Sequence, residues 1–453
     1  MNVGALCRHA PPHRLQDDPM MEAERLDDVS VPRTPVRRAA AVPSVLGPDP
    51  IGEWLAQEGP GLPVGELIAG LSERLLAAGV PIDRATLHLR LLDPQFRGVS
   101  IEWRPDQPVE EIRRAHGVEL TEAYLRSPFM LIAEHGVGVR RRLTGPNAQI
   151  GDFPILADLH EEGFTDYAMM PLAFHDGTPN ALSLATRNPG GFSEGDLRRV
   201  SSLLPMVTLA VEVISQRGQV RTLLKTYLGD DAGERVLAGT IKRGDVERMN
   251  AAIWFSDLRG FTAMSERVAP EVLIATLNDH FEVMNRAITA HGGQVMKLIG
   301  DGVLAVFPTP VREGACPFAG CAALDAARDA VRGMAELNAR RRALGQEPLA
   351  FGLGLHAGEV LYGNIGAPER LDFTVIGQAV NEASRLEVLA RDLGRTVAIS
   401  STIARIVEHM GRRLEPLGTF HLRGLATEEE VYTLPEDCED CGVDVPAEAA
   451  AVR

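Results

Sequence analysis

The sequence of 453 residues predicts an α+β protein with two globular regions joined by a long helix. Three observations lead to this fold class. Helical and strand patterns alternate along residues 51–192 and again along residues 247–435, as expected of mixed domains. A helical pattern fills most of the residues between these two regions. Hydrophobic residues make up 45% of the chain, which is enough to form a core in each region.

Composition and charge indicate a cytoplasmic protein. The formal net charge of −16 argues against a general nucleic-acid binder. The first twenty residues lack the apolar core of a signal peptide. The longest apolar stretch, residues 203–214, is too short for a membrane span and contains Glu212. The five cysteines are scattered, which favours a reducing compartment.

Both ends of the chain are expected to be disordered. Residues 1–50 are rich in Pro, Arg, Asp and Ala and show no apolar periodicity, and residues 436–453 form an acidic tail. Cys438 and Cys441 make a CxxC pair in this tail. A metal or redox site there is disfavoured, because neither a second pair nor a histidine cluster accompanies it.

Residues 51–192 show one helix followed by several strands. The helix covers residues 64–78, and strands are expected at 86–92, 99–103 and 137–143. A hairpin joins residues 167–174 to 181–186 through His175-Asp176-Gly177. This order resembles a GAF-type sensor domain, which would bind an unidentified small molecule. The run 140–142, three arginines, suits either an anionic ligand or, more commonly, a solvated strand edge.

Residues 193–246 are interpreted as a helical linker. Ser193 and Asp196 form an N-cap pair, and apolar residues keep three- and four-residue spacing to about residue 230. Pro205 is expected to kink or break this helix. The pattern slips near Gly218 and then resumes. Two interpretations stay open: a coil between two protomers, or a helix packed on its own sensor domain.

Residues 247–435 alternate strands and helices in a second pattern. A strand leads to Asp257, and a helix covers residues 268–291. Two apolar runs, 294–299 and 302–307, then meet at an Asp-Gly turn that contains Asp301 and are read as a hairpin. The remaining elements are helices at 322–344, 378–393 and 401–410 and strands at 349–356, 373–376, 397–400, 421–423 and 431–434.

Asp257 and Asp301 thus each lie at the end of a buried strand. Paired carboxylates beside a Gly-containing turn suit divalent metal ions that carry a phosphate. Taken alone, they could also be two unrelated turn aspartates. A third segment, LDFTVIGQAVNEASRLE at 371–387, bears on this choice, because Asn381 and Arg385 are four residues apart and share one helix face.

Together, FSDLRGFT, KLIGDG and FTVIGQAVNEASR resemble the class III nucleotidyl cyclases, over about residues 251–434. The resemblance implies a ferredoxin-like, palm-type catalytic domain with an antiparallel sheet backed by helices. It also implies a homodimer in which each active site combines residues of both protomers. The site residues that it implies are Asp257, Asp301 and the backbone carbonyl of Leu258 for two Mg²⁺ or Mn²⁺ ions, Gly260 and Phe261 at the triphosphate, Asn381 at the ribose, Arg385 at the transition state and Arg423 at the terminal phosphates.

Lys297 and Thr374 are the candidate purine-reading residues. Lys297 can only donate a hydrogen bond and Thr374 can accept one, which fits N1 and the 6-amino group of adenine and predicts ATP as the substrate. Guanylate-selective relatives carry an acidic residue and a cysteine here, and the Thr form resembles a bacterial subgroup stimulated by bicarbonate. The alternatives are a guanylate cyclase and an inactive nucleotide-binding regulator. Glu382 replaces the family's usual apolar residue and is expected to face solvent.

Overall fold

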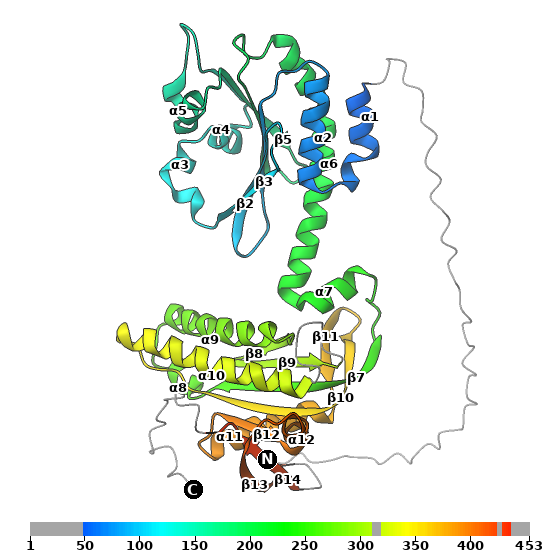
Figure 1. Ribbon diagram of the computed structural model, residues 1–453, viewed down its shortest axis with the longest axis vertical. Coiled ribbons are helices and arrows are strands. Elements are labelled where there is room, and N and C mark those ends of the chain that lie inside the picture. The colour runs from blue at the N-terminus through cyan, green and yellow to red at the C-terminus, as the bar shows by residue number, and fades with distance from the viewer. Residues whose placement is uncertain (1–48, 310–318, 424–427, 436–453) are drawn as a thin grey trace, which may run out of the picture. The chain divides into compact units, whose positions relative to one another are not determined.

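The computed structural model describes residues 49–309, 319–423 and 428–435 (Figure 1). The predicted disorder of residues 1–48 and of the acidic tail, and the Cys438/Cys441 pair, lie outside the described residues. The predicted boundary at residue 50 needs a small correction. Asp49 caps helix α1 (Pro50–Gln57) by accepting a hydrogen bond from the backbone N–H of Ile51, so regular structure begins there.

The first region contains a six-stranded antiparallel sheet in the order β3-β2-β1-β6-β5-β4. Helices α1, α2 and the start of α6 pack on one face, while α4 and α5 pack on the other. The predicted strands and hairpin are present, whereas β3, α1 and the short helices α3–α5 were missed. The elements are α2 (Val64–Ala77), β1 (Arg84–Arg90), β2 (Phe96–Trp103), β3 (Glu110–Ala115), α3 (Glu122–Leu125), α4 (Pro128–His135), β4 (Val139–Arg142), α5 (Pro154–Glu161), β5 (Asp166–Ala173) and β6 (Pro179–Thr186).

The arginine run 140–142 forms the edge strand β4. Arg140 and Arg142 both approach the buried carboxylate of Asp166, and Arg141 pairs with Asp152 at 2.6 Å. Because each guanidinium already has an acidic partner, the run is better explained as a charged strand edge than as a ligand site.

Helix α6 (Glu194–Leu228) is continuous through Pro205, so the expectation of a break there was wrong, whereas a kink at Pro205 stays a prediction. Pro205 lies on the exposed side of the helix, where the carbonyl that loses its N–H partner can be hydrated. The predicted capping box of Ser193 and Asp196 is confirmed. Residues up to Val211 pack on their own sheet, whereas Tyr227 is 81% exposed, so a coil between protomers stays a prediction for the second half of the helix.

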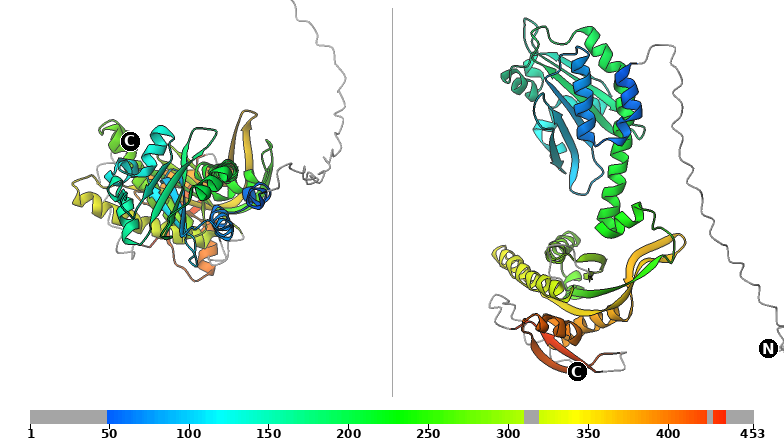
Figure 2. Two further views of the ribbon diagram at one scale, coloured as in Figure 1. Left: turned by 90° about the horizontal axis from the view of Figure 1, so that it is seen from above. Right: turned by 45° about the vertical axis from the view of Figure 1, so that its right-hand side comes forward.

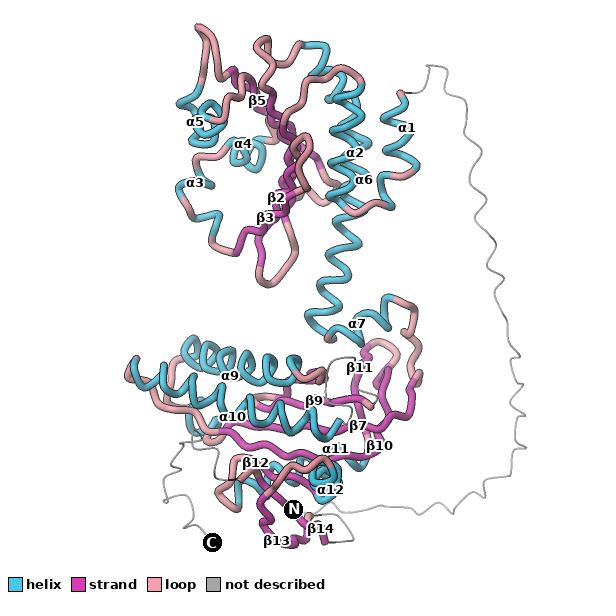
Figure 3. Tube along the Cα trace, viewed as in Figure 1, coloured by secondary structure: helices cyan, strands magenta, loops and turns pink. Residues whose placement is uncertain are grey.

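The second region is built on an eight-stranded sheet (Figure 3). Seven strands follow the order β13-β14-β12-β10-β7-β9-β8, and β11 pairs with β10. The β10–β12 pair is parallel and the others are antiparallel, which matches the expected largely antiparallel sheet. The strands are β7 (Val246–Leu258), β8 (Gln294–Ile299), β9 (Gly302–Pro308), β10 (Phe351–Ala367), β11 (Arg370–Ile376), β12 (Val397–Ser400), β13 (Glu415–His421) and β14 (Glu428–Thr433).

Helices cover both faces of this sheet (Figure 2). Helices α9 (Pro270–Ala290) and α10 (Ala319–Ala343) bury one face, around Trp254 and Leu353. Helix α11 (Gln378–Asp392) and helix α7 (Asp230–Leu237) bury the other face, around Ile253 and Val360. The remaining helices are α8 (Phe261–Ser265) and α12 (Ser401–His409). Alternate residues of β7 therefore belong to two different cores.

Two strand predictions in this region need correction. Strand β10 continues nine residues past Gly358, to Ala367, and forms a long hairpin with β11. The strand expected at 421–423 is instead β13, which ends at His421 and leaves Arg423 in a turn. The sequence pattern missed this strand because it contains Pro416 and Gly418. Both residues are rare in regular strands, and here they flank a bulge.

Within the ranges that the structure describes, none of the helices is both long and apolar enough to span a bilayer.

Candidate active site

Asp257 and Asp301 come together at one end of the sheet, as predicted. Asp257 is the second-last residue of β7, and Asp301 lies in the two-residue turn between β8 and β9. Strands β7 and β9 are paired directly, with Ser256 opposite Val303, so the turn reaches the end of β7. Gly300 has a φ of +63°, which the tight turn requires and which glycine adopts without strain.

The ionised form of Asp257 is disfavoured in this position. The pKa of Asp257 is raised to about 7, first by burial, and then by the hydrogen bond that its protonated carboxyl donates to Asp301 and by the negative charges of Asp301 and Glu387. Two carboxylates that share a site behave in this way when no cation neutralises them. The pair therefore has the chemistry of a divalent cation site.

Arg259, a cation whose charge acts on Asp257, is already engaged by another carboxylate. Its guanidinium Nη1 lies 2.7 Å from Oε1 of Glu387, and both side chains are largely buried. The pair lies over Gly352, the residue of β10 directly opposite Asp257. Burial lowers the pKa of Arg259 and raises the pKa of Glu387. Sequence reasoning missed this pair, because its members are 128 residues apart.

The residues after Asp257 turn from the strand into a short helix. Leu258 is buried at the end of β7, and the N–H of Arg259 donates to the carbonyl of Ala350 at 2.8 Å. Gly260 has a φ of +69° and precedes α8, which begins at Phe261. Gly260 is exposed and Phe261 is half-buried, so this turn forms an accessible border beside the two carboxylates.

Lys297 and Thr374 lie on neighbouring elements, and a third residue joins them. The ammonium of Lys297 lies 2.7 Å from Oδ2 of Asp372, and a hydrogen bond from Lys297 holds the pKa of Asp372 below its usual range. Asp372 and Thr374 are two residues apart on β11 and therefore point to the same face of the strand. Sequence reasoning missed Asp372, although this alternation on β11 was a usable signal.

Asn381 and Arg385 are exposed side chains on α11. Their four-residue spacing places them on one face of the helix, as predicted. Neither side chain forms a hydrogen bond or an ion pair with another residue of the described part of the chain. Arg423 is also exposed, in the turn after β13.

Glu382 does not face solvent as expected. Its side chain is 14% exposed, and Oε2 lies 3.0 Å from Nε2 of His356, a residue of β10. The amide of Gln378 donates to the other carboxylate oxygen at 2.8 Å. The expectation failed because strand β10 places a polar side chain opposite Glu382. The rest of the contact between β10 and α11 is formed by small residues.

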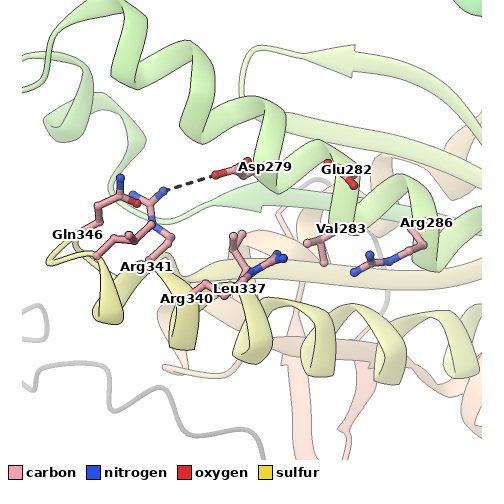
Figure 4. Close-up of a pocket in the computed structure, with 9 residues that line it drawn as sticks. Asp279, Glu282, Val283, Arg286, Leu337, Arg340, Arg341 and Gln346 are labelled. Atoms are coloured by element: carbon pink, nitrogen blue, oxygen red, sulfur yellow. Dashed lines mark ion pairs between the residues drawn. The ribbon is translucent and has the colours of Figure 1, made fainter. Parts of the chain in front are cut away.

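A separate groove lies between α9 and α10 (Figure 4). It has a volume of about 250 Å³, and Arg341 lies 3.9 Å from Asp279 across it. Val283 and Leu337 form apolar parts of the lining, and its charged residues are Asp279, Glu282 and Arg286 from α9 and Arg340 and Arg341 from α10. None of the predicted site residues lines this groove.

Residues 246–436 match the model of the adenylate and guanylate cyclase catalytic domain. Adenylate cyclase 1 of Rhizobium meliloti is 31% identical over 185 residues, which cover 41% of this chain and 27% of that protein. Adenylate cyclase of Anabaena cylindrica is 33% identical over 165 residues, covering 36% of this chain and 32% of that protein. The matched part thus spans about a third of the length of these relatives. The crystal structure of the guanylyl cyclase Cya2 is 32% identical, covers 42% of this chain and 95% of that one, and has a TM-score of 0.36.

Proposed function

Because residues 246–436 form a catalytic domain of the adenylate and guanylate cyclase family, we propose that this protein converts ATP to 3′,5′-cyclic AMP and pyrophosphate. In this reaction the ribose 3′-oxygen bonds to the α-phosphorus, loses its proton, and pyrophosphate leaves. The observation that carries the proposal is the meeting of Asp257 and Asp301 beside the turn at Gly260.

Asp257, Asp301 and the backbone carbonyl of Leu258 would hold two Mg²⁺ or Mn²⁺ ions per site. The fit rests on the donor set: two close carboxylates, and a nearby arginine that is occupied by Glu387. Across the described residues, no group of three or more His, Cys, Asp or Glu side chains converges as a metal site. Substrate phosphates and water would therefore complete the coordination, as Mg²⁺ prefers. When bound, such ions lower the pKa of the 3′-hydroxyl and neutralise the triphosphate.

Adenine recognition is assigned to Lys297 and Thr374. The ammonium of Lys297 has three N–H donors, of which one points to Asp372, so the others remain for N1 of adenine. The hydroxyl of Thr374 accepts from the 6-amino group. Guanine presents a donor at N1 and an acceptor at position 6, and Lys297 offers that N–H no acceptor.

Asn381 and Arg385 would act on the nucleotide of a partner protomer. Both are exposed on α11 and lack partners within the described part of the chain. In a two-fold homodimer, the carboxylate pair of one protomer and α11 of the other would build two equivalent sites. Asn381 would then orient the ribose and Arg385 would stabilise the charge that develops at the α-phosphate. The turn at Gly260 and Phe261 would receive the triphosphate, and Arg423 its terminal phosphates.

We further propose that residues 51–192 sense a small molecule in the cytoplasm and control the cyclase through α6. The support is the continuous helix that leaves the first sheet and ends directly before α7. Because the threonine at position 374 resembles that of the bacterial subgroup stimulated by bicarbonate, bicarbonate is also a candidate activator. The ligand of the first region is not assigned.

The test is an assay of the purified full chain with ATP or GTP, in Mg²⁺ and in Mn²⁺, with cyclic nucleotides separated by chromatography. Cyclic AMP from ATP at a kcat/KM well above that for GTP is the expected result. Preferential cyclic GMP formation would make the protein a guanylate cyclase. Nucleotide binding without either product would make it a regulatory partner.

A further inference from the structure

Helix α11 lies unusually close to strand β10. Gly352, Gly354 and Gly358 all point toward α11 from one face of the strand, and we call this face, together with His356, the α11 seat. A Cβ placed at Gly358 would lie 2.8 Å from Cβ of Ala379, which is closer than real contacts allow. The helix residues that face these glycines are also small, so the backbones of helix and strand come almost into contact.

Contacts between small residues bring the helix close but do little to fix its rotation. Ala379, Ala383 and Ala390 are the alanines on the buried side of α11, and their methyl groups offer few features that interlock with a glycine surface. Leu386, which is fully buried with Ala398 and Leu422, fixes the middle of the helix, and directional contacts add to it in setting the rotation and the position along the axis. The Arg259–Glu387 ion pair supplies one such contact toward the C-terminal half of the helix.

His356 is the one large side chain of the α11 seat, and it meets Glu382. Their Nε2 and Oε2 atoms lie 3.0 Å apart, with side chains 8% and 14% exposed. The other ring nitrogen faces the hydroxyl of Thr402 at 3.5 Å, which in turn lies 2.7 Å from the hydroxyl of Ser400. His356 thus lies between the N-terminal halves of α11 and α12.

Burial favours a neutral ring at His356. Burial lowers the pKa of His356, while the carboxylates of Glu382 and Glu429 act in the opposite direction. We assign the proton of the ring to Nε2, because Nε2 lies 3.0 Å from Oε2 of Glu382 and the hydroxyl of Thr402 can donate to Nδ1. A 3.0 Å contact between a ring nitrogen and a carboxylate in a buried place is a polar contact that holds both side chains in position.

We propose that His356 and Glu382 form a positioning pair that fixes the rotation of α11 and so aims Asn381 and Arg385 at the nucleotide. Glu382 directly follows Asn381 and precedes Arg385 by three residues, within a single turn of helix. The inference rests on the proposed function, because it assigns those two residues to the reaction. It also gives Glu382, which departs from the family's usual apolar residue, a partner on β10.

The test compares Glu382→Leu with Glu382→Gln in the full chain. The leucine restores an apolar residue but cannot accept a hydrogen bond, so we expect kcat to fall about tenfold with little change in KM for ATP. The glutamine oxygen can still accept from Nε2, so we expect this variant to keep a kcat within about twofold of the wild type. Glu408→Leu, an exposed glutamate on α12 exchanged for the same residue, is the matched control and should behave as the wild type.

A double-mutant cycle with His356→Leu separates positioning from general damage. If the two side chains act only through each other, the double variant should lose about tenfold, as each single variant does, rather than about a hundredfold. Thermal unfolding of every variant shows which of them fold. If a leucine variant fails to fold, the kcat of Glu382→Gln relative to the wild type becomes the deciding measurement.

The outcomes keep this inference apart from the proposed function. An inactive wild-type protein would refute the function. An active wild type whose Glu382→Leu variant matches it in kcat, or whose losses at positions 356 and 382 simply multiply, would overturn the positioning pair. An equal kcat loss in Glu382→Gln and Glu382→Leu would also overturn it, since the polar contact with His356 would then not matter.

Discussion

Gly354→Ala should impair catalysis by lifting α11 off its strand. Gly354 lies in the middle of the α11 seat, and its φ is not in the positive range that favours glycine. The added methyl group therefore meets no backbone strain, and the only obstacle is space. A Cβ at this position would lie 2.0 Å from the carbonyl oxygen of Ala383 and 2.6 Å from the backbone nitrogen of Glu387.

The size of the effect follows from these distances. Ordinary contact begins at 3.4 Å, so the carbonyl of Ala383 must retreat by about 1.4 Å. Neither obstructing atom belongs to a flexible side chain, so the helix itself has to move. Overpacking of this kind costs about 1–3 kcal/mol of folding free energy. Because Asn381 and Arg385 move with α11, a shift of about 1 Å should lower kcat by about a hundredfold.

The assay measures kcat and KM for ATP and the midpoint of thermal unfolding, side by side. Gly320→Ala in α10 is the matched control, because its Cβ would meet Ile406 at an ordinary 3.5 Å. We expect the control to keep wild-type activity and to gain slightly in stability from better helix propensity. A Gly354→Ala protein with wild-type kcat and an unchanged unfolding midpoint would refute the close seat of α11.

Three further predictions concern the site, and one concerns the linker. Asp257→Asn should abolish product formation. In metal-free buffer the free energy of unfolding of the wild type should fall between about pH 4 and pH 7, because the raised pKa of Asp257 makes its ionisation unfavourable in the folded protein. The variant lacks this carboxyl, so its free energy of unfolding should fall less steeply over the same range. A wild-type pH slope in a urea titration series would contradict this. Lys297→Glu with Thr374→Cys should raise GTP use relative to ATP, and an unchanged ratio in competition assays would mean that these residues do not read the purine. Mixing Asp257→Ala with Arg385→Ala protein, each inactive alone, should restore up to about a quarter of wild-type activity, whereas confirmed heterodimers without activity would exclude the shared site. Deleting residues 1–228 should change the rate or the dimer affinity, and identical values for both proteins would leave the first region without a role in control.

The local features of the site were predictable from the sequence because they depend on neighbouring residues. The Asp-Gly turn between two apolar runs placed Asp301 at a hairpin tip, where Gly300 takes its positive φ. The four-residue spacing of Asn381 and Arg385 put both on one side of a helix, whatever that helix packs against. These short-range rules located the carboxylates and the exposed helix residues correctly. Which residues act on the nucleotide, and from which protomer, stays a prediction.

Only the tertiary structure decided which distant side chains meet. Lys297 pairs with Asp372 across 75 residues, and Arg259 pairs with Glu387 across 128. Glu382 was expected to face solvent, whereas in the structure β10 places His356 beside it. Each of these contacts depends on strand order and register, and a shift of one residue in β10 would turn His356 to the opposite face of the sheet. Sheet order and register arise from the packing of the whole domain, so no local pattern in the sequence carries them.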